Sequence, residues 1–341
     1  MSHSSFMKRC LELAEKAIGR VAPNPMVGCV IVHEGKVIGE GYHEEYGQAH
    51  AEVNAIGSVK DKGLLGRSTL YVNLEPCAHY GKTPPCADLI LTHKIPYVVI
   101  GTIDPFAAVK GKGIEKLARA GVDVKAGVLE TECRELNRRF FTFHEKQRPY
   151  IILKWAQTAD HFIARLDKGR PETASYISAP ETLRLVHQWR SQEAGIMVGT
   201  RTVEADNPAL TVRHVSGRNP VRIVFDRELR LPAGAKIFDE AAPTLVFNAQ
   251  RSGRRGNAEL IACYELPAVM KELHARSIQS VIVEGGTRLI RSFVELGLWD
   301  EMRVLTSPLK FGTGVPAPFP AGKPARQETM GPDRIAIYRN V

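Results

Sequence analysis

Hydrophobic and polar positions in the first part of the chain repeat with two alternating periods. Near the N-terminus, apolar residues recur at helical spacing on one face of a segment that Ser4 or Ser5 can cap: Met7, Cys10, Leu11, Ala14, Ala17 and Ile18. Short β-branched runs then alternate with amphipathic segments. They predict strands at 27–33, 36–41, 69–74, 97–102 and 122–125, with a hairpin turn at 34–35, and helices at 50–60, 85–93 and 113–120. This order is typical of a three-layer α/β/α domain.

The pattern changes near residue 147. A charged helical segment at 130–144 is followed by a polar stretch that ends in Pro149, a residue that stops helices. Strands are then expected at 150–156, 196–199, 221–225, 244–247, 280–284 and 301–306. The stretch 211–258 is expected to be an irregular excursion that carries edge strands. We therefore predict two domains, 1–146 and 147–341, both of the α/β class.

Length and apolar content agree with two globular domains. A prior of roughly 150 residues per domain gives about two domains for 341 residues. The longest apolar runs, at 27–32 and 97–101, are far shorter than the ~20 residues that span a bilayer. The N-terminus lacks the apolar core of a signal peptide, and the six cysteines are too scattered for a secreted disulfide scaffold. We therefore expect a cytoplasmic protein without membrane segments.

The chain is basic. Lysine and arginine number 46 and aspartate and glutamate 37, which gives a net charge of +9. An excess of this size suits a nucleic acid, an anionic membrane surface or a phosphorylated small molecule. Charge alone does not choose among these partners.

The strongest chemical signal is an ordered set of metal-binding residues. His50 and Glu52 stand at the start of a predicted helix, and Cys77 and Cys86 follow. Two thiolates and one imidazole bind Zn²⁺ and leave its fourth position open, as in catalytic sites. Zinc nucleobase deaminases carry H-x-E followed by P-C-x-x-C, with the glutamate as proton carrier. Here eight residues separate the cysteines, so the stretch 81–85 must bring Cys86 back to the site.

These residues predict hydrolytic deamination with one Zn²⁺ per chain. Zinc lowers the pKa of its bound water to about 7. Glu52 can take that proton and return protons to the ring nitrogen and the departing amine, so that ammonia leaves. A structural zinc site would need a fourth ligand and would not explain Glu52. The cysteines at 10, 29, 133 and 263 have no partner at metal spacing and are expected in the core.

Motifs in both halves resemble one family. They are PNPMVG at 23–28, HAE at 50–52, EPCAHYGKTPPC at 75–86, LKWAQTAD at 153–160, VGTRTVEADNPALTVR at 198–213 and VEGGTRLI at 283–290. Over nearly its whole length the chain is similar to the bifunctional riboflavin-biosynthesis deaminase–reductases. The resemblance implies a cytidine-deaminase-like α/β/α domain and a dihydrofolate-reductase-like α/β domain. The first would deaminate 2,5-diamino-6-(5-phosphoribosylamino)pyrimidin-4(3H)-one, and the second would reduce the ribosyl group of the product to ribityl with NADPH.

The same resemblance implies a role for individual residues. In the first domain it makes His50, Cys77 and Cys86 the zinc ligands, Glu52 the proton carrier, Asn24 a pyrimidine contact and Lys82 a phosphate contact. In the second domain it implies cofactor contacts at Ala156, Tyr176, Thr202, Asp206, Gly285, Gly286 and Thr287. Substrate contacts are implied at Lys154, Arg190, Leu210, Arg213 and Glu284. A glycine pair before a helix also lets backbone N–H groups approach a phosphate. The implied partners are a phosphorylated pyrimidine and further copies of the chain in a homo-oligomer, with no nucleic acid or membrane.

The chain departs from the family pattern at three places. Many family members have S-L-D-G where this chain has Thr-Ala-Asp-His at 158–161, so His161 stands where glycine is usual. Tyr176 replaces a tryptophan and still offers the cofactor an aromatic surface. The loop at 104–107 replaces the commoner D-P-N-P. None of these changes touches the zinc set.

Two other functions remain open at this point. A zinc deaminase of nucleosides or nucleic acid, with a degraded or regulatory C-terminal nucleotide-binding domain, would use the positive charge to hold phosphates. It should carry basic residues interleaved with aromatics, yet aromatics make up only 7% of the chain. A metal-stabilised regulatory protein would not need the proton carrier Glu52.

Overall fold

The computed structural model describes residues 2–80, 84–107, 109–167, 170–171, 177–320 and 322–340. The chain forms two compact units, Met1–Lys146 and Gln147–Val341. Each unit has its own sheet and its own hydrophobic cores. In the described part of the chain, no helix is both long enough and apolar enough to cross a membrane.

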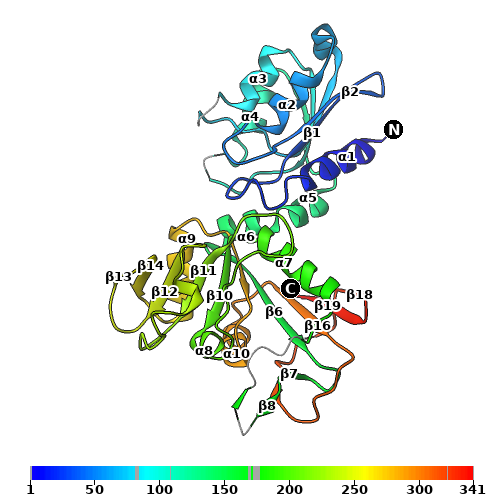
Figure 1. Ribbon diagram of the computed structural model, residues 1–341. Coiled ribbons are helices and arrows are strands. Elements are labelled where there is room, and N and C mark those ends of the chain that lie inside the picture. Colours follow the sequence, from blue (N-terminus) through cyan, green and yellow to red (C-terminus); the bar gives the residue numbers. More distant parts are fainter. Residues whose placement is uncertain are drawn as a thin grey trace. The chain divides into compact units, whose positions relative to one another are not determined.

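The first unit is a five-stranded sheet between two layers of helices (Figure 1). The strand order is β2-β1-β3-β4-β5, with β1 antiparallel to β2 and β3 and the last three strands parallel. The strands are β1 (Gly28–His33), β2 (Lys36–Tyr42), β3 (Thr69–Leu74), β4 (Tyr97–Thr102) and β5 (Asp123–Lys125). The helices are α1 (His3–Glu15), α2 (Ala51–Ser58), η1 (Lys62–Arg67), α3 (Cys86–Thr92), α4 (Lys112–Arg119), α5 (Glu130–Leu136) and α6 (Arg138–Lys146).

Both faces of this sheet are buried. Along β1, Cys29 and Ile31 pack with α2 and α3, whereas Val30 and Val32 pack on the opposite face with α1 and α5. This alternation follows from the two-residue period of a strand. The three-layer α/β/α prediction is therefore confirmed for this unit.

Three local predictions in this unit need correction. The cap of α1 is Ser2, whose side chain accepts the backbone N–H of Ser5, and not Ser4 or Ser5. Ile18 is 42% exposed because α1 ends before it. The expected helix at 130–144 is split into α5 and α6 at Asn137. The buried Asn137 amide accepts the backbone N–H of Met26 at 2.8 Å and donates to its carbonyl at 2.9 Å, which fixes the break.

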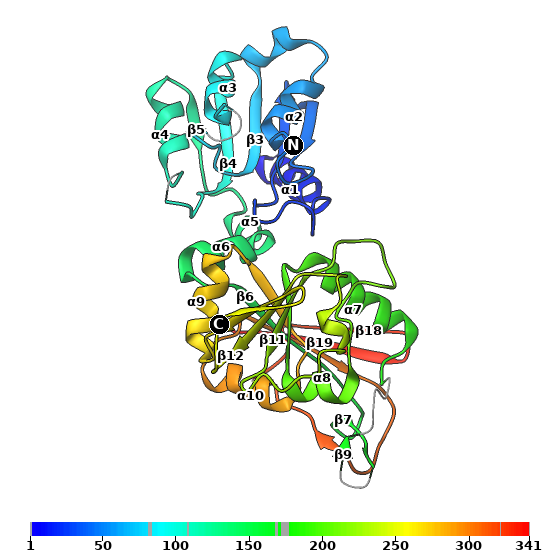
Figure 2. The ribbon, with the colours of Figure 1, turned by 60° about the vertical axis from the view of Figure 1, so that its left-hand side comes forward.

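The second unit contains a ten-stranded sheet covered by helices on both faces (Figure 2). The strand order is β13-β14-β12-β11-β10-β15-β6-β16-β19-β18. Its strands are β6 (Tyr150–Gln157), β10 (Gly195–Gly199), β11 (Val221–Phe225), β12 (Thr244–Asn248), β13 (Gly253–Arg255), β14 (Ala258–Ala262), β15 (Ser280–Val283), β16 (Glu301–Thr306), β18 (Arg326–Met330) and β19 (Asp333–Arg339). The run from β14 to β16 is parallel.

Two helices pack on each face of this sheet. Buried residues of α7 (Pro180–Gln192) and α8 (Thr200–Asp206) belong to one core, as does Ile237 of η2 (Lys236–Phe238). Buried residues of α9 (Leu266–Ala275) and α10 (Thr287–Glu295) belong to the other core. Two short pairs complete the unit: β7 (Phe162–Ala164) with β17 (Val315–Pro316), and β8 (Leu166–Asp167) with β9 (Arg170–Pro171).

The prediction of edge strands within 211–258 is wrong for two of its strands. Strands β11 and β12 lie inside the sheet, and only the short antiparallel β13 is at its edge. The polar composition of this stretch arises partly from Arg222, which is fully buried on β11. Its guanidinium donates to the backbone carbonyls of Lys236 and Asp239, at the start of η2 and just after it, so a charged residue is accommodated inside the sheet.

Candidate functional site

Three side chains of the first unit lie close enough together to share a metal ion. The ligand atoms of His50, Cys77 and Cys86 all lie within 4.8 Å of one another. The Nδ1 atom of His50 is 3.3 Å from Sγ of Cys86 and 3.7 Å from Sγ of Cys77. Two sulfurs and one ring nitrogen match the donor set of catalytic zinc sites that keep one position open. The donor chemistry and spacing therefore fit Zn²⁺.

Helix and strand ends hold these ligands in place. His50 is the N-cap residue of α2, and Cys86 is the first residue of α3. Cys77 follows β3, and the backbone N–H of Cys86 donates to its sulfur at 3.3 Å. Glu75 is buried and accepts hydrogen bonds from the backbone N–H groups of Asp104, Gly111, Gly113 and Ile114. These bonds tie the turn that carries Cys77 to the start of α4.

The thiols and the carboxyl group at this site have shifted pKa values. The hydrogen bond with Cys86 and, to a smaller extent, that with His50 lower the pKa of the Cys77 thiol to about 4, although burial opposes this shift. The hydrogen bond with Cys77, together with burial, raises the pKa of Cys86. Glu52, in the first turn of α2, is 3% exposed, and burial and the charge of Cys77 raise its pKa. Cys77 is thus ready to serve as the thiolate that metals bind.

His43 belongs to this site although no sequence motif revealed it. Its buried ring donates from Nδ1 to the carbonyl of Ala49, so Nε2 accepts the side-chain amide of Asn24 at 3.1 Å. The ring centroid lies 5.6 Å from that of His50. Burial lowers the pKa of His43 and keeps the ring neutral for these contacts. His43 therefore lies between Asn24, the expected pyrimidine contact, and His50, one of the three residues that could hold the metal ion.

The loop after β4 supplies a second residue that the sequence motifs did not reveal. Burial raises the pKa of Asp104 to about 7, and its Oδ1 accepts the backbone N–H of Phe106 at 2.8 Å. Its own backbone N–H donates to Glu75, which stands two residues before Cys77. Lys82 lies outside the described residues, so its expected phosphate contact stays a prediction.

A cleft of about 800 Å³ lies in the second unit at the carboxyl ends of β6, β15, β10 and β11. Ligands of open α/β sheets bind in this position as a rule. The lining includes these residues expected from the sequence: Lys154, Ala156, Thr202, Asp206, Glu284, Gly285, Gly286 and Thr287. The fold therefore gathers most of the expected contacts of this unit in one cavity.

A buried charge cluster lies in the cleft wall. Lys154 on β6 places Nζ 3.4 Å from Oε2 of Glu284, which follows β15. Arg190 on α7 donates from Nε and Nη2 to the two oxygens of Glu284, both at 2.8 Å. Burial lowers the pKa of Lys154. Burial alone would raise the pKa of Glu284, but the charges of Arg190 and Lys154 outweigh it and hold the pKa well below its usual range.

Gly285 and Gly286 are explained by packing as well as by their expected contact with the cofactor. A Cβ on Gly285 would lie 2.9 Å from the backbone nitrogen of Gly199, which leaves no room for a side chain. The N–H of Gly286 donates to Oγ1 of Thr202 at 2.9 Å. Gly286 is also the N-cap residue of α10, whose positive end faces the cleft.

Among the described residues, three expected contacts do not line the cleft: Arg190, Leu210 and Arg213. Arg190 pairs with Glu284, which itself lines the cleft. Leu210 is 2% exposed in the core beside α7, with a positive φ of 54°. The side chain of Arg213 is exposed. Tyr176 lies outside the described residues, so its cofactor contact stays a prediction.

The cleft also contains basic residues beyond the contacts expected from the sequence. Arg201, Arg227 and Arg288 are part of its lining. The guanidinium of Arg227 lies 5.4 Å from the ring centroid of Tyr264, which also lines the cleft. An arginine-rich cleft with an aromatic face suits a phosphorylated ligand that carries a base.

Comparisons with known proteins agree with this two-part architecture. Residues 1–102 match the cytidine and deoxycytidylate deaminase zinc-binding region, and residues 149–331 match the RibD C-terminal domain. Riboflavin biosynthesis protein RibD of Aquifex aeolicus is 42% identical over 320 residues, which cover 91% of this chain and 88% of that protein. RibD of Escherichia coli is 33% identical and covers 92% of this chain and 89% of its own length.

A solved structure matches the fold over the full length. It is a diaminohydroxyphosphoribosylaminopyrimidine deaminase/5-amino-6-(5-phosphoribosylamino)uracil reductase from Thermotoga maritima, 38% identical, with a TM-score of 0.90 and 99% of both chains covered. Acinetobacter baumannii RibD has a TM-score of 0.88 at 31% identity and covers 98% of both chains. The chain therefore belongs to the RibD family of riboflavin biosynthesis proteins.

Proposed function

We propose that this chain catalyses two successive steps of riboflavin biosynthesis. Residues 1–146 deaminate 2,5-diamino-6-(5-phosphoribosylamino)pyrimidin-4(3H)-one, and residues 147–341 reduce the ribosyl group of the product to ribityl. The observation that carries the proposal is the buried carboxyl of Glu52 in the helix turn that follows the metal ligand His50, with Cys77 and Cys86 within 4.8 Å of that ligand. A metal site that served only structure would not need this carboxyl group.

The first step uses the donor set of the first unit. His50, Cys77 and Cys86 would hold one Zn²⁺, which when bound would lower the pKa of a water molecule toward neutral pH. Glu52 takes one proton from that water and gives it to the ring nitrogen, and it then transfers the remaining hydroxyl proton of the adduct to the departing amine, which leaves as ammonia. Asn24, oriented by His43, donates to the edge of the pyrimidine. Lys82 binds the substrate phosphate.

The second step uses the cleft of the second unit with NADPH, which supplies the hydride. Ala156, Tyr176, Thr202, Asp206 and residues 285–287 bind the cofactor. Arg227 beside Tyr264 favours NADPH over NADH, because a guanidinium can bind the additional 2′-phosphate. Lys154 and Glu284 offer the ribosyl hydroxyls one buried cation and one buried anion. Arg190, Leu210 and Arg213 complete the substrate site.

The remaining partners follow from this chemistry. Both substrates and the cofactor carry phosphate, so the net charge of +9 attracts phosphorylated small molecules and no nucleic acid is needed. A cytoplasmic homo-oligomer without membrane contact is part of the proposal.

A single substitution tests the assignment. Glu52→Gln keeps the shape of the side chain but cannot carry the proton, so ammonia release should fall by about 10²–10⁴-fold. NADPH oxidation on the deaminated substrate should stay at the wild-type rate. Glu34→Gln, at an exposed turn, serves as the matched control. Full ammonia release by Glu52→Gln would refute the role of Glu52, and a wild-type protein that oxidises no NADPH would refute the second step.

A further inference from the structure

The segment 207–213 carries two of the proposed substrate contacts, Leu210 and Arg213, yet it has no regular secondary structure. Leu210 has a φ of 54°, which a leucine adopts only when its surroundings hold it there. The exposed side chain of Arg213 binds a phosphate more tightly when the backbone beneath it is already fixed, because less entropy is then lost on binding. The hydrogen bonds of this segment therefore decide where the arginine points.

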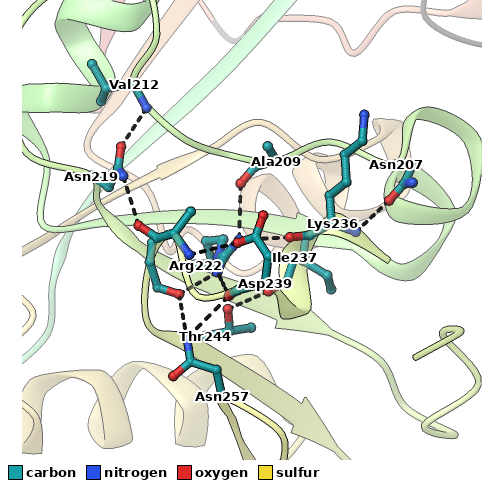
Figure 3. Close-up of polar contacts among 12 residues, drawn as sticks. Asn207, Ala209, Val212, Asn219, Arg222, Lys236, Ile237, Asp239, Thr244 and Asn257 are labelled. Carbon is teal, nitrogen blue, oxygen red and sulfur yellow. Dashed lines mark hydrogen bonds and ion pairs between the residues drawn. The ribbon is translucent and has the colours of Figure 1, made fainter. Parts of the chain in front are cut away.

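One side of the segment is fixed by the network around Arg222 (Figure 3). The guanidinium of Arg222 donates to the carbonyl of Ala209 at 3.4 Å, and the side chain of Asn207 accepts the backbone N–H of Lys236 at 2.8 Å. The side chain of Asn219 accepts the backbone N–H of Val212 at 2.8 Å. These bonds hold residues 207–212 but leave the backbone of Arg213 to a different partner.

That partner is His187 on α7. Its ring is 3% exposed, and Nδ1 accepts the backbone N–H of Arg213 at 3.2 Å. A ring nitrogen accepts a hydrogen bond only while it carries no proton. Burial, with the nearby charges of Arg190 and Arg213, lowers the pKa of His187 to about 4, so the ring is neutral under ordinary conditions.

We propose that His187 is a positioning residue of the reductase step. Through Nδ1 and the backbone N–H of Arg213, it fixes the segment that presents the Arg213 guanidinium to the phosphate of the substrate. The inference rests on the proposed function, because it takes the phosphorylated product of the deaminase step as the ligand of Arg213. His187 itself is not part of the cleft lining.

Two amide substitutions separate this role from simple core packing. In His187→Asn the side-chain oxygen lies at the place of Nδ1 and keeps the acceptor, whereas in His187→Gln the oxygen lies near the place of Nε2. Glutamine is a better helix former than asparagine. A higher KM in His187→Gln than in His187→Asn therefore cannot arise from a weakened helix α7. His214→Ala is a further control, because this exposed neighbour contacts the His187 ring at a centroid distance of 4.5 Å.

The measurement is the KM of the full-length protein for 5-amino-6-(5-phosphoribosylamino)uracil at saturating NADPH. His187→Gln should raise this KM by about fivefold or more, since a lost hydrogen bond of about 1 kcal/mol corresponds to that factor. Its kcat and its KM for NADPH should stay unchanged. His187→Asn and His214→Ala should keep KM close to the wild-type value. In an Arg213→Ala background, His187→Gln should have no further effect on KM.

The possible failures are distinguishable. A wild-type protein that oxidises no NADPH overturns the proposed second step and this inference together. An active wild type in which the Asn and Gln variants behave alike overturns the inference alone. So does a KM effect of His187→Gln that persists in the Arg213→Ala background, since His187 would then act through another group.

Discussion

At the scale of single residues, His161 shows why glycine is usual at one position of the reductase half. Its φ is 65°, in the left-handed region where a Cβ costs about 1 kcal/mol or more. Histidine is among the residues that tolerate this region, and the Gln157 amide donates to its ring at 3.1 Å. The structure thus relates the departure from the family pattern to backbone conformation.

This strain predicts an unusual order of stability. His161→Gly and His161→Ala both remove the ring, but only alanine keeps the Cβ, so the glycine variant should be about 1 kcal/mol more stable than the alanine variant. Urea unfolding followed by tryptophan fluorescence measures this, because Trp155, Trp189 and Trp299 all lie in the second unit. Ala159→Gly, two residues away and without a positive φ, should lower stability. Equal stabilities of the two His161 variants would contradict the strain.

The buried carboxylate of Glu284 should make the stability of the second unit depend on pH. Its side chain is 8% exposed and pairs with Lys154 and Arg190, so Glu284→Gln should lower the free energy of unfolding at pH 7 by about 3 kcal/mol. The folded pKa is depressed, so the unfolded chain binds this proton first, near pH 4.3. The carboxylate therefore stabilises the fold above that pH and loses its contribution as the pH falls further.

Urea unfolding of wild type and Glu284→Gln from pH 7 down to pH 3 checks the sign. The difference between the two proteins should shrink below about pH 4.3. Glu240→Gln, an exposed glutamate of the same unit, should match the wild type at every pH. A difference that grows on acidification would contradict the assigned charge state.

Some site residues could be predicted from the sequence, whereas others could not. The spacing of His50, Glu52, Cys77 and Cys86 predicts a catalytic zinc site from the sequence alone, because few functions need that donor set. His43 and His187 act through single contacts with Asn24 and with the backbone of Arg213. Such contacts depend on how distant segments meet, and no spacing along the chain encodes them.

At the scale of elements, helix α4 packs directly on the turn that carries a metal ligand. A Cβ on Gly113 would lie 2.0 Å from the carbonyl oxygen of Pro76, the residue before Cys77. The N–H of Gly113 also donates to Glu75 at 2.8 Å. The close approach of helix and turn therefore requires glycine, although its φ is not positive.

Gly113→Ala should displace the Cys77 turn and weaken zinc binding by about 10-fold or more, as loss of support around metal ligands does. Competition with a chromophoric zinc chelator measures the affinity without any enzymatic assay. Gly57→Ala is the matched control, since its Cβ would point into open space at the end of α2. That variant should keep the zinc affinity and gain about 0.5–1 kcal/mol of stability. Equal affinities of both variants would contradict the role of this packing.

The boundaries of helices and strands were predictable where the pattern of hydrophobic residues fitted only one type of element. The strands β3, β4, β11 and β16 begin and end where the pattern placed them. The break between α5 and α6 was not predictable, because it depends on the pairing of Asn137 with the distant backbone of Met26. The interior place of β11 was missed for a similar reason, since Arg222 finds its acceptors 14 and 17 residues further along the chain, in contacts that no sequence pattern encodes.

At the scale of the whole molecule, the two chemistries are separated between the units. The proposed zinc ligands His50, Cys77 and Cys86 all lie in Met1–Lys146, and the cleft lies in Gln147–Val341. The described ion pairs of Glu284 are with Lys154 and Arg190, which belong to the same unit. The reductase charge cluster therefore needs no group from the zinc site.

Zinc removal should accordingly inactivate one activity and spare the other. After treatment with a chelator, ammonia release should be lost because Glu52 alone does not lower the pKa of water, and added Zn²⁺ should restore it. NADPH oxidation on the deaminated substrate should keep its rate. The urea midpoint seen by tryptophan fluorescence should stay unchanged, because all three tryptophans report on the second unit. Loss of NADPH oxidation on metal removal, with recovery on adding Zn²⁺, would instead mean that the cleft depends on the folded zinc site.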